Sequence, residues 1–516
     1  MVTRVHSALI EGIDARPVEV EVDLDDRGLA KETVVGLPDA AVKESLDRVK
    51  AAMANAGYPF PPGKVLINLA PADVRKEGPM YDLPVAVGLL AAQGVLITQA
   101  GPGTGGVDPR TFVIAGELAL DGRVRPIKGA LAIADMARRR GFAGVIVPAG
   151  NASEAAVVGG IDVIGVSTLA EVVGVLSGAL EIEPHPPVDV ESLIASAEAP
   201  VDFADVRGQE GVKRAIVIAA AGSHNLVMVG PAGTGKTMMA KALPGILPPL
   251  SPTEAIETTR VYSAAGMLDS EQGIVAVRPV RSPHHTASAP AVVGGGIVPR
   301  PGEISLAHHG VLFLDELPEF PRPVLETLRQ PLEDDVVTIA RAAGTVRFPA
   351  RFMLVAAMNP SHKGGASPGA AGQREMERYL GRLSGPLLDR IDIHVEAPSV
   401  KYEELRSGPV GVSSADMRAQ VIRARAIARG RQGEDRTNAR LTGRQLDRWA
   451  PLDQTAETLL GQAITELGLS ARAYDKIRRV ARTIADLDER HAGDETPLTS
   501  SHVAEAVGYR LLDRRV

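Results

Sequence analysis

The run Gly230-Pro231-Ala232-Gly233-Thr234-Gly235-Lys236-Thr237 has the residue types that are needed to hold a nucleoside triphosphate. It fits the pattern G-x-x-x-x-G-K-[ST], in which glycines turn backbone N–H groups toward the phosphates. We expect Lys236 to reach the β- and γ-phosphates and the Thr237 hydroxyl to bind Mg²⁺. An apolar strand at 226–229 and a helix after the loop are the context that the pattern requires. This context disfavours the alternative, a glycine-rich turn that matches by chance.

A further apolar stretch is followed by acidic residues that suit phosphate hydrolysis. Residues 311–314 are Val-Leu-Phe-Leu, and Asp315 and Glu316 follow them. A buried central strand of this kind delivers its carboxylates to the edge of the sheet where the phosphate loop lies. Asp315 is expected to hold Mg²⁺ through water, and Glu316 to polarise the attacking water. An acidic pair after a strand is weak evidence alone, but together with the phosphate loop it predicts a hydrolase.

The surrounding segments resemble AAA+ ATPases. Residues 203–210, Phe-Ala-Asp-Val-Arg-Gly-Gln-Glu, are similar to the segment before the phosphate loop in that superfamily. The resemblance implies that Val206, Gly208 and Gln209 line the adenine pocket. The strand at 352–358 precedes Asn359, which fits the sensor-1 role of orienting water against the γ-phosphate. A turn-forming asparagine before Pro360 is the alternative.

The same resemblance assigns two arginines. Residues 385–392 contain the motif that supplies an arginine finger, so Arg390 is expected to reach the γ-phosphate of a neighbouring subunit, which implies a ring. Arg472, at the start of a helix in the C-terminal lid, matches the sensor-2 arginine by position. The lid is expected to close over adenine and carry Arg472 to the phosphates. Local ion pairs with Asp389 or Asp475 are the alternative for both arginines.

Composition and patterning indicate how the chain is organised around this site. Its 516 residues suggest about three domains, and 45% hydrophobic and 23% charged residues are typical of globular chains. No apolar run is long enough to span a membrane, no signal peptide is evident, and the absence of cysteine excludes disulfides, so a cytoplasmic protein is expected. We predict an α/β fold in four parts: a first domain at 1–180, a proline-rich linker at 181–200, an ATPase core with a parallel sheet at 201–400, and a helical lid at 401–516.

The predicted first domain resembles the proteolytic domain of Lon-type proteases. Residues 116–129 and 147–155 carry the resemblance. A Lon-type protease needs a serine nucleophile after a Gly-Pro pair and a lysine base. Here Met80 follows Gly78-Pro79, and the lysine position falls near Leu131. We therefore predict a Lon-like fold without peptidase activity. A displaced dyad of Ser45 and Lys43 is the alternative, and a solvated helix face explains those two residues better.

Residues 280–288, 299–320, 382–390 and 480–487 narrow the resemblance to the ComM/YifB group of magnesium-chelatase-like AAA+ ATPases, nearly end to end. Characterised members are hexameric DNA helicases that drive branch migration during natural transformation. The resemblance therefore implies ATP, Mg²⁺, a homo-hexamer, DNA and recombination proteins as partners, with no membrane. Relatives carry a cysteine cluster after the sensor-1 asparagine, whereas residues 361–370 here hold one histidine and no cysteine, so no zinc is expected.

Two insertions in the core are candidates for contact with DNA. The first, at 260–300, is rich in glycine and proline, and the second, at 333–351, alternates as a β-hairpin does. Such a hairpin projects into the channel of related ring helicases. Sequence-independent contacts to phosphates are expected from the basic residues of both insertions, Arg278, Arg281, Arg300, Arg341 and Arg347, and from His284 and His285. Support of the fold or of a subunit interface is the alternative for Arg281 and the histidines, His308 and His309 included.

The sequence thus predicts an ATP-driven, ring-forming DNA motor. A net charge of −7 argues against a globally basic DNA-binding protein but leaves a local basic channel open. A chelatase-type remodeller of protein or metal–porphyrin complexes, without DNA, is the alternative from another class. An ATP-dependent protease is disfavoured because the Ser/Lys pair is missing.

Overall fold

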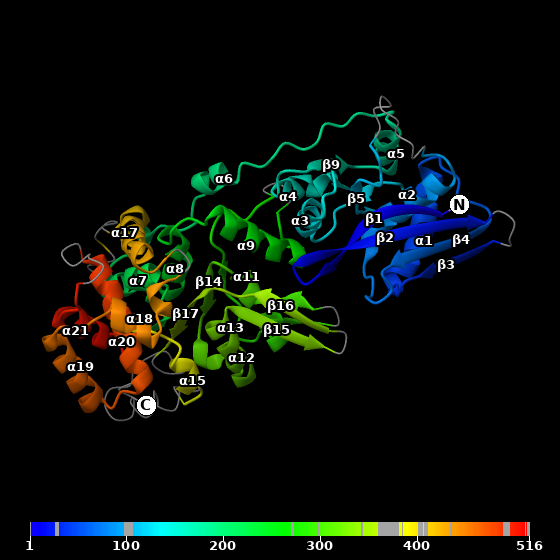
Figure 1. The fold of residues 1–516 in the computed structure, drawn as a ribbon. Helices are drawn as coiled ribbons and strands as arrows, with labels where there is room; N and C mark the ends of the chain where they lie inside the picture. Colours follow the sequence, from blue (N-terminus) through cyan, green and yellow to red (C-terminus); the bar gives the residue numbers. More distant parts are fainter. Residues whose placement is uncertain are drawn as a thin grey trace. The chain divides into compact units, whose positions relative to one another are not determined.

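The structure is a computed structural model (Figure 1). The chain forms two compact units. Unit 1 comprises Met1–Leu193 and Pro252–Ala276, and unit 2 comprises Ile194–Ser251 and Val277–Val516. The described residues are 2–25, 30–96, 107–269, 273–296, 299–341, 344–359, 381–383, 385–400, 406, 411–433, 436–488, 496–510 and 512. No helix among them is both long and apolar enough to cross a membrane.

Unit 1 is built on a mixed seven-stranded sheet in the order β3-β4-β2-β1-β5-β8-β9. Its strands are β1 Val2–Glu11, β2 Asp14–Asp25, β3 Lys31–Val35, β4 Lys64–Ala70, β5 Phe112–Ile114, β8 Gly144–Pro148 and β9 Asp162–Val166, with β6 Glu117–Leu118 and β7 Val124–Arg125 forming a separate pair. Its helices are α1 Ala40–Asn55, α2 Asp82–Ala92, α3 Ala130–Arg140, α4 Ala152–Ala156, α5 Leu169–Ser177 and α9 Pro252–Ala265, and the division between the units falls within α6 Val190–Ser196.

Local sequence patterns predicted several of these elements, because a strand or helix with one buried face shows regularly spaced apolar residues. The alternation at 18–24 becomes β2, in which Val18, Val20 and Val22 are buried. The amphipathic stretch from Asp39 becomes α1, and the Asp39 carboxylate caps it by accepting from the backbone N–H of Val42 at 2.7 Å. Strand β1 gave no such signal, because its burial does not alternate along residues 2–11.

Helix α9 belongs to unit 1, although the chain enters it from the phosphate-loop segment of unit 2. Its Arg260 pairs with Asp135 of α3 at 2.8 Å, and its Ser263 hydroxyl donates to the buried Glu154 of α4. The first predicted insertion, 260–300, is therefore divided: residues up to Ala276 pack with unit 1 and residues from Val277 with unit 2. The glycine- and proline-rich composition of 260–300 did not predict that its first residues continue helix α9. Contacts with α3 and α4 hold those residues in the helix.

Unit 2 contains the predicted parallel sheet, and this confirms the α/β class. Its five strands run in the order β11-β14-β17-β10-β18, and all neighbouring pairs are parallel. They are β11 Val280–Arg281, β14 Val311–Leu314, β17 Met353–Met358, β10 Leu226–Val229 and β18 Ile393–Glu396. The predicted hairpin is present as β15 Val336–Arg341 and β16 Gly344–Pro349, and β12 Gly294–Gly295 pairs with β13 Arg300–Pro301.

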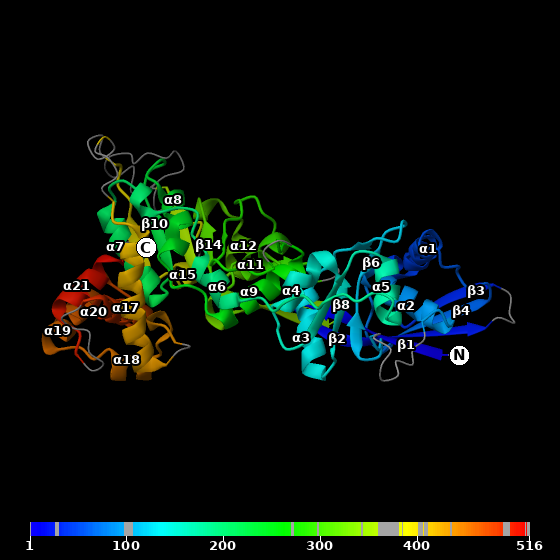
Figure 2. The same ribbon diagram turned by 90° about the horizontal axis from the view of Figure 1, so that it is seen from above.

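The helices of unit 2 fall into two groups along the sequence. Those between and beside the sheet strands are α7 Glu210–Gly222, α8 Lys236–Ala242, α10 Ala289–Val293, α11 Glu303–Leu306, α12 Arg322–Thr327, α13 Arg329–Asp334 and α15 Gly385–Leu388. The C-terminal lid consists of α17 Ser414–Gln432, α18 Gly443–Trp449, α19 Gln454–Leu467, α20 Ala471–Leu487 and α21 Ser500–Gly508. Helices α19, α20 and α21 lie side by side in both views (Figures 1 and 2).

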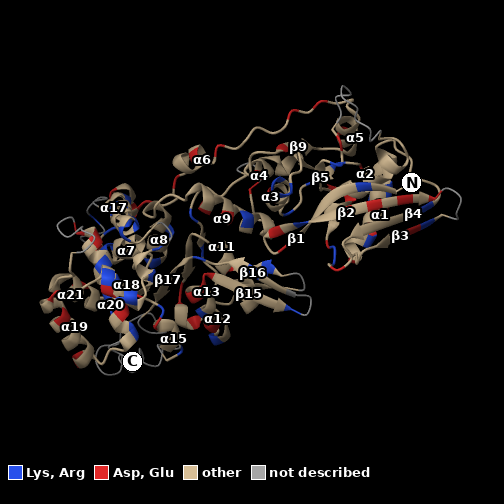
Figure 3. Ribbon diagram, in the orientation of Figure 1, with Lys and Arg blue, Asp and Glu red and all other residues tan. Residues whose placement is uncertain are grey.

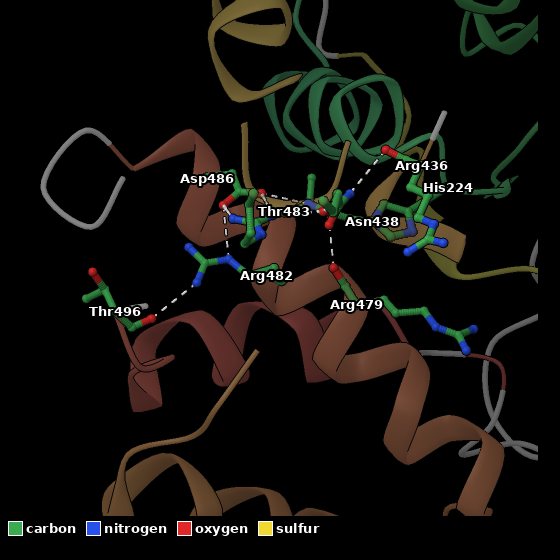
Figure 4. Close-up of polar contacts among 10 residues, drawn as sticks. His224, Arg436, Asn438, Arg479, Arg482, Thr483, Asp486 and Thr496 are labelled. Carbon is green, nitrogen blue, oxygen red and sulfur yellow. Dashed lines mark hydrogen bonds and ion pairs between the residues drawn. The ribbon is translucent and has the colours of Figure 1, made fainter. Parts of the chain in front are cut away.

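A buried polar cluster ties the lid together (Figure 4). The Asp486 carboxylate accepts from Arg431 at 2.7 Å, from Arg482 at 3.0 Å and from the Asn438 amide at 2.7 Å. Thr483, on the same helix, contacts the ring of the buried His224 at 2.7 Å. Because the side chains of Arg431, Arg482 and Asp486 are at most 1% exposed, the carboxylate must neutralise two buried guanidinium groups.

Replacing Asp486 by Ala is expected to destabilise the lid by about 3–5 kcal/mol, because two buried arginines lose their counter-ion. Urea unfolding can be followed by the fluorescence of Trp449, the single tryptophan, which lies in α18. The control is Asp447→Ala, which removes a 74%-exposed partner of Arg478 and should cost less than about 1 kcal/mol. Equal effects of the two substitutions would contradict the importance of burial.

Candidate nucleotide-hydrolysis site

The phosphate-binding loop joins β10 to α8, as the sequence pattern requires. Gly233 and Gly235 have φ angles of 80° and 84°, a region that side chains disfavour. At Gly230 a Cβ atom would lie 2.1 Å from the carbonyl oxygen of Ala397, so only glycine fits. These glycines let the loop curl at the N-terminus of α8, where backbone N–H groups are free of helical partners and favour an anion.

Lys236 folds back on its own loop. Its Nζ donates to the carbonyl oxygens of Gly230 and Pro231, both at 2.7 Å, and lies 3.3 Å from Oδ1 of Asn359. Burial lowers the pKa of Lys236 below its ordinary value, and the nearby Asp315 partly opposes this shift. The ammonium group is therefore held by neutral carbonyls that charged phosphate oxygens can replace with stronger bonds.

The residues expected to act on the γ-phosphate meet at the same edge of the sheet. Because β14, β17 and β10 are parallel neighbours, Asp315, Asn359 and the loop all follow the carboxyl ends of their strands. The Thr237 hydroxyl donates to the Asp315 carboxylate at 2.8 Å. These two hard oxygen ligands suit Mg²⁺, which would take its remaining ligands from water and phosphate. Glu316 follows Asp315 in a left-handed conformation, with φ 53°.

The segment expected at the adenine lies against the same loop. Gln209 is buried, and its side-chain amide donates to the carbonyl oxygens of Pro398 at 2.6 Å and Thr234 at 3.4 Å. Gly208 and Gln209 both have φ 61°, a turn that starts α7, and Val206 is buried beside them. The structure thus brings Gln209 to the loop, although its role toward adenine stays a prediction.

Arg390 and Arg472 do not reach this edge within the chain. They line one cavity of about 390 Å³, which also borders Asn225, Phe352 and Asp392, the residues just before β10, β17 and β18. The cavity therefore lies at the amino edge of the sheet, opposite the phosphate loop. Arg390 pairs with Glu333, and Arg472 pairs with Asp389 at 2.9 Å while remaining 71% exposed. Within the chain Arg472 does not lie at the phosphate loop, and its sensor-2 role stays a prediction.

A buried ion pair fixes the lid helix beside this cavity. Lys476 of α20 lies 2.9 Å from the carboxylate of Asp392, and the ring of His224 lies 3.5 Å from the same carboxylate. Burial alone would raise the pKa of Asp392, but Lys476 and His224 outweigh it and hold the pKa well below its ordinary value. Asp392 thus stays charged at neutral pH, and it holds α20 against the strand that follows Arg390.

The basic residues predicted to contact DNA separate into two sets. Arg278 donates to the carbonyl oxygens of Pro248 at 2.6 Å and His309 at 2.7 Å, and Arg281 makes two bonds with Glu303 at 2.6 and 2.7 Å. Both arginines are thus bonded within the fold, and their contact with DNA stays a prediction.

The other set consists of Arg300, Arg341 and Arg347, which are exposed on β13, β15 and β16. Arg300 and Arg341 both lie close to Gly295. Gly295 pairs with Arg300 across β12–β13, and the guanidinium of Arg341 lies 3.4 Å from the position that a Cβ atom of Gly295 would take. Figure 3 shows the basic segments of the β15–β16 hairpin. This exposed set, Arg300, Arg341 and Arg347, is called the arginine edge below.

The histidine pairs also differ from each other. His308 accepts from the backbone N–H of Arg351 at 3.0 Å, and the backbone N–H of His309 donates to the carbonyl of Arg351, so both support the strand entry. His285 instead lies against Glu316, with 3.3 Å between Nδ1 and Oε2. The sequence analysis missed this contact. A signal was present, because His285 and Glu316 stand four residues after Arg281 and Leu312, a pair of neighbouring strand residues.

The proteolytic positions of unit 1 hold buried apolar residues. Met80 and Leu131 are 8% and 0% exposed, so neither a nucleophile nor a base stands there. The Ser45 hydroxyl is buried and donates to the Asp82 carboxylate, whereas Lys43 is exposed on the same helix. The structure therefore does not bring Ser45 and Lys43 together as a dyad. Residues 361–370, where zinc was not expected, lie outside the described residues.

Comparison with known proteins places this geometry in a family. Three family models match: magnesium chelatase, subunit ChlI, over residues 202–405; subunit ChlI of Mg-chelatase over residues 20–151; and the ChlI C-terminal part over residues 411–510. Competence protein ComM of Haemophilus influenzae is 42% identical over 99% of this chain and 97% of its own. The chain belongs to the ComM/YifB family of magnesium-chelatase-like proteins.

Two other relatives are similar over nearly the whole chain, and a third is similar over less than half of it. YifB of Escherichia coli is 42% identical over 99% of this chain, and an uncharacterized protein of Mycobacterium tuberculosis is 40% identical over 98% of it. The magnesium-chelatase 38 kDa subunit of Cereibacter sphaeroides is 25% identical over 40% of this chain. Full-length similarity to ComM/YifB proteins thus includes unit 1.

Replacing Lys236 by Ala is expected to weaken ATP binding at least about tenfold, because the phosphates lose a charge-assisted bond. Titration with a fluorescent ATP analogue measures the change. Lys241→Ala is the matched control, since Lys241 is exposed on the same helix and outside the loop. An unchanged affinity in Lys236→Ala would contradict the assignment of this loop.

Proposed function

We propose that the chain is an Mg²⁺-dependent ATPase that works as a homo-hexameric ring and moves branched DNA, in the manner of a ComM-type branch-migration motor. The observation that supports the ring is the separation of the catalytic groups. The phosphate loop, Asp315, Glu316 and Asn359 lie at one edge of the sheet, while Arg390 and Arg472 line a cavity at the other. A second copy that presents its amino edge to the loop completes the site.

The mechanism follows from these positions. Lys236 and the loop N–H groups bind the phosphates, and Thr237 and Asp315 would hold Mg²⁺, which neutralises charge on the phosphates. Glu316 orients and polarises the attacking water, and Asn359 fixes it relative to the γ-phosphate. Arg390 and Arg472 of the next subunit stabilise the charge that develops on the transferred phosphoryl group. Hydrolysis then changes the fit between subunits and shifts the hairpins along the DNA.

Mixing two inactive variants tests whether the site is shared. Lys236→Ala lacks a working loop, and Arg390→Ala lacks the finger, so each alone should lose about 10³-fold or more in ATPase rate. A mixture forms some interfaces in which an intact loop faces an intact Arg390, and we expect measurable turnover to return. A mixture of Lys236→Ala with Glu316→Gln is the control, because both substitutions remove the loop side of the site.

Recovery with Arg390→Ala but not with Glu316→Gln supports action in trans, and no recovery in either mixture contradicts it. Arg472→Ala in place of Arg390→Ala extends the same test to the lid arginine. Glu316→Gln alone should abolish hydrolysis and keep ATP-dependent assembly, as seen by size-exclusion chromatography. Retained turnover in that variant would contradict its role as the base.

The arginine edge is the proposed contact with DNA. Removing Arg341 and Arg347 together should lower the slope of log affinity against log salt by about 1.5–2, because each phosphate contact releases a counter-ion. Fluorescence anisotropy with a four-way DNA junction measures the slope. Arg444→Ala is the control, an exposed arginine of the lid helix α18. No DNA binding by the wild-type protein at low salt would favour a chelatase-type remodeller of protein complexes instead.

A further inference from the structure

Arg390, the proposed arginine finger, is held by an acidic residue of its own chain. Its Nη2 pairs with the carboxylate of Glu333, and its Nη1 donates to the carbonyl oxygen of Pro386. Its Nε is buried and has no hydrogen-bond partner among the described residues. The side chain of Arg390 is 15% exposed and that of Glu333 is 60% exposed. The contact therefore leaves one donor of the guanidinium unused, and the carboxylate remains open to solvent.

Glu333 lies at the foot of the β15–β16 hairpin. It belongs to the last turn of α13, three residues before Val336, where β15 begins. Between them Asp335 has a φ angle of 56°, which residues other than glycine adopt rarely, and its carbonyl oxygen accepts from the backbone N–H of Ala350 at 2.8 Å. Residues 333–335 are called the hairpin stem below. Because the stem is continuous with β15 and bonded to the residue after β16, a shift of Glu333 would be transmitted to both strands.

The charges of the stem are unfavourable locally and are compensated by distant arginines. Glu333 and Asp334 place two negative charges at the C-terminal end of α13, where the helix dipole is negative and no basic residue stands in the last turn. Arg440, which precedes the lid helix α18, pairs with Asp335 and donates to the carbonyl oxygen of Glu333 at 3.3 Å. Arg390 supplies the other compensating charge. The stem thus has two ionic ties, and one of them is the proposed finger.

A terminal phosphate offers a guanidinium more acceptor oxygens and more negative charge than one carboxylate does. Arg390 and Glu333 both border the cavity of about 390 Å³ at the amino edge, so such a group from a second copy could approach the pair. We propose that Glu333 is a positioning residue that ties Arg390 to the hairpin stem, and that ATP bound by the neighbouring subunit draws Arg390 away from it. One tie on the stem is then released, which links ATP binding in one subunit to the hairpin of the next. This inference rests on the proposed function, because it assumes the shared site.

Steady-state ATPase kinetics of the full chain test the competition for Arg390. In Glu333→Gln the side chain keeps its size but loses its charge, so Arg390 no longer breaks an ion pair to reach ATP. KM for ATP should fall by up to about fivefold, the upper value for a partly exposed ion pair, and kcat should stay unchanged. Asp334→Asn is the matched control, because it removes the same charge from the exposed neighbouring residue and should leave KM unchanged. An unchanged KM in Glu333→Gln, or an equal fall in both variants, would overturn the proposal.

A spin label on the hairpin measures the release of the stem directly. The chain has no cysteine, so Thr345→Cys at an exposed position of β16 gives a single labelling site. In a Glu316→Gln background, which is expected to keep ATP bound, adding ATP should increase the mobility of the label in its electron paramagnetic resonance spectrum. Glu333→Gln should show the mobile spectrum without ATP, and Asp334→Asn should not. A spectrum that does not respond to ATP, or that is the same in Glu333→Gln and Asp334→Asn, would contradict the coupling.

The failures of the two proposals can be told apart. If ATP causes no assembly, the ring is wrong, and the spectra without ATP still decide whether Glu333 ties the stem. If mixing Lys236→Ala with Arg390→Ala restores turnover but the label does not respond to ATP, the shared site stands and the coupling through Glu333 is wrong. Arg390→Ala should free the label as Glu333→Gln does, and the double variant should match either single variant, because both remove the same contact. Additive changes in the double variant would show that the two residues act separately and would overturn the tie.

Discussion

The parallel register of five short strands is the constraint on which the rest of unit 2 depends. Because β14, β17 and β10 run side by side in one direction, their carboxyl ends bring the acids, the asparagine and the phosphate loop together. Because the strands are parallel, they all begin at the opposite edge of the sheet, the amino edge. There Asp392, just before β18, neutralises Lys476 and holds the lid helix close to the two arginines. One hydrogen-bonding pattern thus sets both halves of the proposed shared site.

The interactions on the two edges differ in kind. At the amino edge and in the lid, buried ions such as Asp486 with Arg431 and Arg482 fix one arrangement, because any alternative leaves a charge unpaired. At the carboxyl edge the contacts are exchangeable: the buried Lys236 donates to neutral carbonyl oxygens, and the partly exposed Glu316 lies against His285. This division suits the proposed hydrolysis cycle, in which Lys236 and Glu316 would exchange partners while the buried ion pairs stay in place.

Much of this could be predicted from the sequence, for a physical reason. The phosphate loop, the apolar strands and the amphipathic helices are local, since each depends on residues within a few positions of one another. The placement of Arg472 at the amino edge, the membership of α9 in unit 1 and the contact of His285 with Glu316 depend on how distant segments pack. Arg278 and Arg281 show the same limit, because their carbonyl and carboxylate partners come from elsewhere in the fold.

Helix α9 has a consequence for how the two units are joined. Since unit 1 is made of two separate stretches of chain, the polypeptide passes between the units three times, near residues 193, 251 and 276. The proline-rich segment is therefore one of three covalent connections. Cutting the chain there would leave α9 in the second fragment with Ala255, Thr259 and Val261 deprived of the surface that buries them. Loss of unit 1 by simple truncation would expose this apolar surface, so a single cut cannot separate the two units cleanly.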